Sequence, residues 1–438
     1  MTSKIVVNNI EADAGVSTVT FGSKISSTEF VGPVVGNVTG NLTGTASTAT
    51  AAATAYGISG SPTLSGITSV STTNLTVNGN AYPNAGPLSN RNLIINGDMQ
   101  VWQRGTSSTS SDFRTADRFY YNFGNTLAGT QSRQTLSSGT PYDEGFRYSY
   151  RFTISTPGDA TSTYCQLIQG IEAQNIATSG WQYASADSDI TVSFWVQSSV
   201  AQTFYGAFVT EDGTQQTYVF SFALSAGTWT KVTKTIPGNS NVTIDNNTGK
   251  GADLIIYPFM GTNYSDSGVN VDAWQAYGGG TRIPDMDTTW MSTNGATFEV
   301  TGVQLEVGSV ATPFEHRSFG DELLRCQRYY YRVVPEGNVT GFGPCAGQNG
   351  TRALAYISFP TSMRVRPTSL QQSGTASDYY IRLALADTVC NSVPTMHDKS
   401  TENGAMLNVY VASGLSGGYA AIFGANTSNG YLAFSADI

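Results

Sequence analysis

The sequence predicts an all-β protein, and three of its features lead to that prediction. Among 438 residues, only 12% are charged, about half the usual share, while 11% are aromatic and 47 are glycine. Stretches rich in Leu, Lys, Glu and Ala, which favour helices, are nearly absent. Short runs in which apolar and polar residues alternate recur along the chain, as expected for half-buried strands separated by turns.

Charge and composition exclude several classes of function. A net charge of -9 and scattered basic residues argue against nucleic acid, whose phosphates require a basic stripe. The chain has neither an apolar segment after Met1 nor a run long enough to span a membrane, so we expect a soluble product of a cytoplasm. With four widely spaced cysteines and two histidines, buried free thiols are expected, and no metal site or cofactor.

Residues 1–27 are predicted to be an attachment segment. Two short strands, Ile5–Val7 and Val16–Phe21, flank the turn-forming stretch Asp13–Gly15. A hairpin of this size is not stable alone, so it needs a larger partner to dock on.

Residues 28–91 are predicted to form a stalk and neck. Gly36–Ala46 repeats every four residues, so an extended strand places Gly, Val, Leu and Ala on one face and Asn and Thr on the other. One chain buries too little on this face to offset the entropy of ordering it, whereas copies wound together share the face. A disordered linker is the equally weighted alternative, and Ala46–Ala55 fits either a coiled or an extended segment.

Residues 92–317 are predicted to form a head domain that begins and ends with paired strands. Asn92–Gly105 and Phe298–Gly308 both show alternation, and Gly97 and Gly302 lie where a bulge or close backbone contact is expected. Together with further alternating runs this makes roughly eight strands, which predicts a two-sheet jelly roll. Those further runs are Phe119–Phe123, Phe146–Ile154, Ile190–Val196, Tyr218–Leu224, Trp229–Ile236 and Leu254–Met260.

Residues 318–438 are predicted to form a smaller distal β-domain, a second sandwich at the tip. Ser318 is expected to cap a helix that runs into a strand at Tyr329–Val333. Further strands are expected at Ala353–Phe359, Tyr379–Leu385, Leu407–Val411, Ala420–Phe423 and Tyr431–Phe434.

Several of these stretches resemble bacteriophage tail fibres. The motifs similar to the heads of such fibres are Asn92–Gly105 (NLIINGDMQVWQRG), Ala116–Tyr120, Gly302–Ser318 and Arg325–Tyr331. The repeat at Gly36–Ala46 and the phrase Thr73–Tyr82 resemble the stalks of marine cyanophage fibres, and Phe359–Pro367 resembles distal fibre strands. The paired head motifs are the specific part of this resemblance.

The resemblance implies an elongated homotrimer in the virion. Its N-terminus would dock on a tail or baseplate protein, and its distal end would meet a host surface glycan or protein. The head also resembles jelly rolls of carbohydrate-binding modules, some of which hold a structural calcium. Asp98, Asp117 and Glu306 are oxygen donors for such an ion, but six or more ligands are needed, so solvated surface carboxylates are the better interpretation.

Aromatic residues in irregular stretches are the candidates for glycan binding, since sugars need flat apolar faces beside polar groups. In the head these are Tyr264, Trp274, Tyr277 and Trp290, around the glycine run at 278–280, and in the distal domain they are Tyr379 and Tyr419. For any one of them, packing within the domain or against a neighbouring chain is the more common role.

Two other functions compete with adhesion. A glycan-cleaving tailspike needs two carboxylates facing a groove, for which Asp285 with Asp287 and Glu211 with Asp212 are weak candidates. Glu315–His316 lacks an accompanying nucleophile motif, so no enzyme activity is expected. A structural spacer without a receptor is the third possibility.

A truncated chain tests the predicted roles of attachment segment and stalk. Deletion of residues 1–27 is expected to leave a folded trimer, measured by sedimentation equilibrium, that no longer joins the phage particle. A monomeric product contradicts the shared stalk, and continued incorporation into particles contradicts the attachment role.

Overall fold

The computed structural model describes residues 75–77, 80–82, 90–384 and 386–438, all within one unit, Ser71–Ile438. The predicted attachment segment and the stalk repeat therefore lie outside the described residues. Within the predicted neck, β1 (Leu75–Val77) and β2 (Asn80–Tyr82) pair as an antiparallel hairpin.

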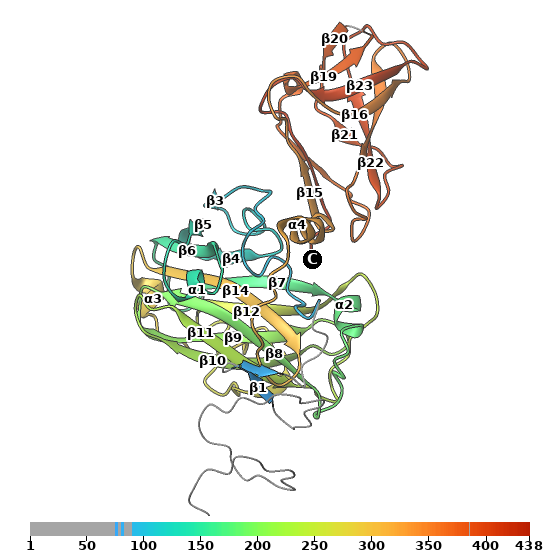
Figure 1. Ribbon diagram of the computed structural model, residues 1–438. Helices are drawn as coiled ribbons and strands as arrows, with labels where there is room; N and C mark the ends of the chain where they lie inside the picture. Colours follow the sequence, from blue (N-terminus) through green and yellow to red (C-terminus); the bar gives the residue numbers. More distant parts are fainter. Residues whose placement is uncertain (1–74, 78–79, 83–89, 385) are drawn as a thin grey trace, which may run out of the picture. The chain divides into compact units, whose positions relative to one another are not determined.

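Two six-stranded antiparallel sheets form the sandwich of the head (Figure 1). In spatial order, the first sheet contains β13 (Ala273–Ala276), β10 (Gln216–Leu224), β9 (Gln202–Thr210), β12 (Lys250–Met260), β7 (Tyr164–Glu172) and β4 (Tyr120–Gly124). The second sheet contains β11 (Thr230–Pro237), β8 (Asp189–Ser198), β14 (Thr297–Val307), β6 (Tyr148–Thr156), β5 (Ala128–Thr135) and β3 (Ser107–Ser108). Short helices α1 (Thr140–Asp143), α2 (Ala173–Ala177) and α3 (Thr289–Ser292) lie between strands.

An aromatic core fills the space between the two sheets. Phe152 and Phe194 of the second sheet and Phe208 and Phe220 of the first are fully buried. Each such ring contributes roughly 1.5–3 kcal/mol by leaving water. The prediction of an all-β, two-sheet jelly-roll sandwich is thereby confirmed.

The prediction that Asn92–Gly105 is the first strand is wrong. Asn96 and Met99 have φ values of 63° and 57°, in the left-handed region, so the stretch turns back on itself. The Asn96 side chain stabilises this loop by donating to the carbonyl of Val101 at 2.9 Å. In place of the expected strand pairing, isolated hydrogen bonds join this loop to β14. The Leu93 N–H donates to Leu305 O, and the Val303 N–H donates to Gly97 O.

Five strands of the head, β3, β5, β7, β9 and β13, were not predicted from the sequence. In β5, Gly129 and Gln131 are the buried residues, so no hydrophobic alternation marks the strand. In β7 and β9, however, apolar residues face the core, so the sequence signal was present and was missed. In β14, by contrast, the expected run is present, and Gly302, at φ 63°, sits in the register shift between Thr301 and Gln304 as predicted.

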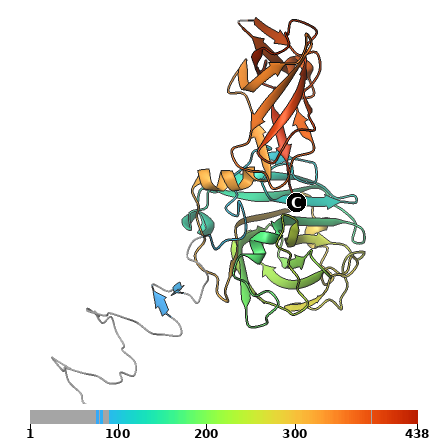
Figure 2. The ribbon, with the colours of Figure 1, turned by 90° about the vertical axis from the view of Figure 1, so that its right-hand side faces the viewer.

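The chain after the sandwich begins with α4 (Phe319–Gln327), whose N-terminus is capped by the Ser318 hydroxyl as predicted. A three-stranded sheet contains β15 (Tyr330–Val333), β24 (Leu432–Ser435) and β18 (Leu370–Gln372). A seven-stranded sheet contains β20 (Ala386–Val389), β19 (Tyr379–Leu383), β23 (Ala420–Ala425), β16 (Thr340–Gly347), β17 (Arg352–Ser358), β22 (Gly404–Tyr410) and β21 (Thr395–Met396). These strands, coloured orange to red in Figure 2, include all those predicted from the sequence.

Gly97 tests the close contact between the head loop and β14. A Cβ at this position would lie 2.0 Å from the carbonyl oxygen of Val303, a backbone atom that has little room to move. We expect Gly97→Ala to lower the free energy of unfolding by about 1–3 kcal/mol, measured by chemical denaturation. Gly320→Ala is the control, because a Cβ there has no neighbour within 4 Å, and equal losses in both variants contradict the prediction.

Candidate functional site

The outer face of the first sheet, turned away from the core, carries half-buried tyrosines. Along β12, Leu254 and Ile256 point into the core whereas Ile255 and Tyr257 point outward, as strand alternation requires. The same alternation in the neighbouring strands places Tyr120, Tyr164 and Tyr205 on the outer face. This side of the sheet is therefore amphipathic rather than simply solvated.

Two loop segments, residues 261–272 and 277–288, flank the edge strand β13 and pack on this outer face. Val269 and Ile283 are buried there against the outward residues of the sheet, and Tyr257 beneath them is fully buried. Backbone hydrogen bonds join the two segments, including the Arg282 N–H to Tyr264 O at 2.9 Å. Ordered loops carried by a rigid sheet commonly hold binding residues.

Tyr164, Tyr264, Tyr277 and Arg282 form what we call the tyrosine–arginine cluster. The rings of Tyr164 and Tyr264 meet edge to face, with centroids 5.8 Å apart. The Arg282 guanidinium carbon lies 5.3 Å from the centre of the Tyr264 ring and 6.0 Å from that of Tyr277. Cation–π contact and a hydrogen bond from Arg282 Nε to Gly279 O (3.1 Å) hold the guanidinium group in place.

Charged and polar groups surround the cluster. Lys250 Nζ lies 3.3 Å from Glu211 and 2.7 Å from Asp253, and burial raises the pKa of Asp253 to about 6. Burial also raises the pKa of Tyr277, although Arg282 opposes this, so its phenol stays protonated at neutral pH. The cluster thus offers flat rings, neutral hydroxyls and one guanidinium group, which is a suitable set for binding sugars.

The structure brings together two of the predicted site residues, Tyr264 and Tyr277. Tyr419, directly before β23, is 63% exposed, and its proposed role stays a prediction. Trp274 is half-buried and occupied by structural contacts, since its Nε1 donates to Pro237 O at 2.6 Å and its ring packs on Phe208 and Tyr218.

Two predicted site residues are core residues, and for them the prediction was wrong. Trp290 is fully buried, where its Nε1 donates to Thr297 O at 3.0 Å and its ring packs on Phe152. Tyr379 is also fully buried, and its hydroxyl donates to Tyr431 O at 2.7 Å. Neither ring presents a face to a ligand.

Tyr164 and Arg282 of the cluster were missed by the sequence analysis. Tyr164 begins a strand in which Cys165 and Leu167 point into the core, so its outward parity was a usable signal. Arg282 carried no such signal, because only the folding of the loop brings it over the two rings.

The three acidic candidates for calcium are buried, so the interpretation as solvated carboxylates was wrong. Asp98 is 4% exposed, Asp117 0% and Glu306 1%. Protein groups satisfy two of them: Thr312 donates to both oxygens of Glu306, and the Gln103 N–H donates to Asp117 at 2.7 Å. Across residues 90–384 and 386–438, no group of three or more His, Cys, Asp or Glu side chains is placed to hold a metal ion.

Most of the acidic residues considered for glycan cleavage make contacts within the fold. Ser265 donates to Asp285 at 2.7 Å, Glu211 pairs with Lys250, and Glu315 accepts the Asn92 N–H at 2.9 Å.

All four cysteines are free and buried, as expected. No helix in the described part of the chain is long and apolar enough to cross a bilayer.

Comparisons with known proteins show likeness only to solved structures. No family model and no curated protein matches the chain. One similar structure is described as CBM4, with 11% identity over 48% of this chain and 97% of that one, and a TM-score of 0.26. A tandem CBM22-1–CBM22-2 domain from Paenibacillus barcinonensis shows 9% identity over 81% and 98% of the two chains, with a TM-score of 0.25.

A phage protein is among the similar structures. The tripod (BppUct-A-L) from the baseplate of bacteriophage Tuc2009 shows 11% identity over 64% of this chain and 86% of that one, with a TM-score of 0.22. At such low identities and TM-scores, these likenesses carry no argument about what the chain binds. The assignment to the all-β sandwiches rests on the strand pairing itself.

The buried carboxyl group of Asp98 is expected to make the stability of the fold depend on pH. Burial, with the charge of Glu322 adding to it, raises the pKa of Asp98 to about 6, and its buried Oδ1 has no hydrogen-bond partner among the described groups. The folded state therefore holds the proton of Asp98 more tightly than the unfolded chain does. The fold is stabilised by this proton fully below about pH 4, and the stabilisation is lost as the pH rises through 6.

We therefore expect the Asp98→Asn variant to gain stability relative to the native chain by roughly 2–3 kcal/mol between pH 4 and pH 7. The measurement is the free energy of unfolding of both proteins at each pH. A difference between the two proteins that stays constant with pH contradicts the raised pKa.

Proposed function

We propose that this chain is the receptor-binding tail fibre of a bacteriophage, acting as a homotrimer. In this proposal residues 1–27 dock on a tail or baseplate protein, and the head binds a glycan of the host surface. The observation that carries the glycan-binding part is the tyrosine–arginine cluster on the outer face of the first sheet. The paired head motifs, which resemble those of tail fibres, support the assignment to a phage.

The chemistry of the cluster suits a sugar. Tyr264 and Tyr277 offer rings that pack against the C–H faces of a sugar, and their hydroxyls are neutral donors. Asn125 Nδ2 donates to the Tyr264 hydroxyl at 3.3 Å, so this phenol is already oriented. Preorganised groups lose little entropy on binding, which favours affinity at a small site.

A trimer makes a weak single site sufficient. When three heads are joined on one fibre, the second and third contacts form at a high effective concentration, and overall binding exceeds that of one site. We propose binding without cleavage, because the contacts of Asp285 and Glu211 give both carboxylates structural roles.

Two substitutions in the cluster test the proposal on the full chain. Tyr264→Ala and Tyr277→Ala are each expected to weaken binding to host cells or their purified polysaccharide at least roughly tenfold, as for residues at the centre of an interface. The control is Tyr142→Ala, because Tyr142 is a half-buried tyrosine under Arg147 at 4.2 Å, outside the cluster.

The other outcomes assign other functions. Loss of binding on Tyr419→Ala alone places recognition in the distal domain. Shortening of the polysaccharide by the native chain indicates an enzyme. Absence of saturable binding to cells and polysaccharide indicates a structural spacer.

A further inference from the structure

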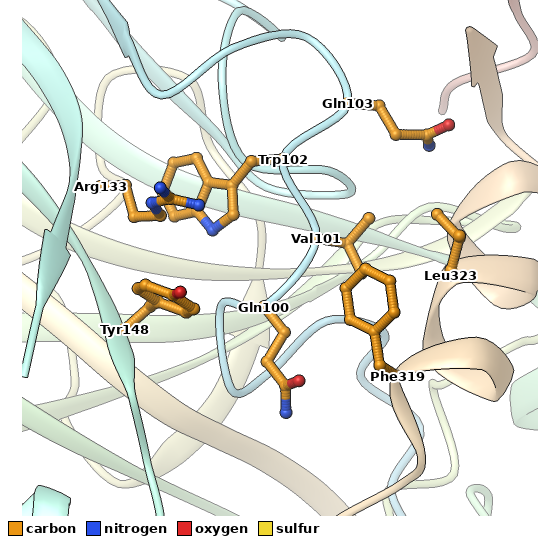
Figure 3. Close-up of a pocket in the computed structure, with 8 residues that line it drawn as sticks. All are labelled: Gln100, Val101, Trp102, Gln103, Arg133, Tyr148, Phe319 and Leu323. Carbon is orange, nitrogen blue, oxygen red and sulfur yellow. The ribbon is translucent and has the colours of Figure 1, made fainter. Parts of the chain in front are cut away.

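A groove of about 490 Å³ opens beside the loop at residues 100–103. Figure 3 shows the side chains of one wall, Trp102, Arg133 and Tyr148, and those of the other, Val101, Phe319 and Leu323. Gln100 lies between the two walls, and Gln103 completes the lining. The volume falls in the range typical of small-molecule sites.

The groove forms where the apolar filling of the sandwich ends. In β6, Phe152, Tyr150 and Tyr148 share the core-facing side of the strand, and the first two are fully buried. Trp102 meets Tyr150 edge to face, with centroids 5.3 Å apart, and its Nε1 donates to Met99 O. Tyr148, the next ring in the row, is only half-buried. The last aromatic rings of the core therefore line the groove.

Among the described residues that line this groove, Arg133 carries the only charged side chain. It lies on β5 opposite Tyr150, and its guanidinium carbon is 4.5 Å from the centre of the Tyr148 ring. Among the described residues, its guanidinium group makes no hydrogen bond or ion pair. Arg147, by comparison, also lies over a tyrosine, but it donates to the carbonyls of Tyr142 and Phe146.

An arginine that is held over a ring and has no carboxylate partner is placed to bind an anion. The fork of N–H groups matches a carboxylate, and stacking on Tyr148 keeps it oriented before the ligand arrives. The amide nitrogens of Gln100 and Gln103 donate to Asp98 and Asp117. Their amide oxygens remain as acceptors for hydroxyl groups.

We propose that this groove is a subsite for a carboxylate-bearing sugar unit, such as a uronic acid, of a cell-surface polysaccharide. The carboxylate pairs with Arg133, and the apolar face of the sugar packs between Trp102 and Phe319. The hydroxyls donate to the glutamine oxygens. This inference rests on the proposed function only in that the ligand is a glycan, and it concerns a site separate from the tyrosine–arginine cluster.

The test compares acidic and neutral probes on the full chain. The probes are oligomers of galacturonate and of glucuronate, and the same oligomers after reduction of their carboxyl groups. By titration calorimetry, we expect an acidic oligomer to bind at least tenfold more tightly than its reduced form. We also expect the affinity for the acidic oligomer to fall as salt is added. Arg133→Gln is expected to abolish this preference, whereas the matched variant Arg147→Gln keeps it.

The outcomes separate this inference from the proposed function. Thermal unfolding checks that Arg133→Gln remains folded, and Arg133→Lys, which keeps the charge but not the planar fork, is expected to recover only part of the preference. If the native chain binds host polysaccharide through Tyr264 and Tyr277 but does not distinguish acidic from reduced oligomers, this inference is wrong and the proposed function stands. If Arg133→Gln changes the oligomeric state and leaves saccharide binding intact, the groove belongs to an interface between copies and the inference is overturned.

Discussion

The burial of charged side chains beside Asp117 is the constraint on which the rest of the head depends. Asp117 and Arg118 are both at most 1% exposed, and Arg104 pairs with Asp117 at 3.2 Å and also with Asp437 near the C-terminus. Arg118 lies over the ring of Tyr329 at 3.6 Å. A buried charge that loses its partner costs several kcal/mol, so these segments are held together although they are far apart in the sequence.

A second buried pair follows the same rule. Glu172, at the end of β7, is fully buried and accepts from Arg328 at 2.6 Å and from the Tyr329 hydroxyl at 2.7 Å. Asp117 is fully buried, and this burial raises its pKa to about 6 even though Arg104 opposes the shift. The head motif, the end of β7 and the residues after α4 therefore fold as connected parts.

The two proposed sugar sites follow from the limits of one hydrophobic core. Between the sheets, apolar rings are fully covered by the opposite layer. On the outer face of the first sheet the cover is only the loop segments that flank β13, and the row of core rings in β6 ends at Tyr148. Tyr264 of those segments and Tyr148 are therefore only half-buried. In both places an arginine lies over a tyrosine. Although the net charge of the chain is -9, each proposed site therefore offers a ligand a local positive charge.

The sequence by itself determined the fold class, most strands and the start of α4, because strand alternation and the Ser318 cap are local properties of neighbouring residues. It also marked Gly97 and Gly302 as points of close contact or bulging. Only the tertiary structure decided that Trp290 belongs to the core while Tyr264 meets Arg282, and that Asp98 and Asp117 are buried. The physical reason is that alternation divides a strand into two faces, whereas the second layer and the loops decide which face is covered.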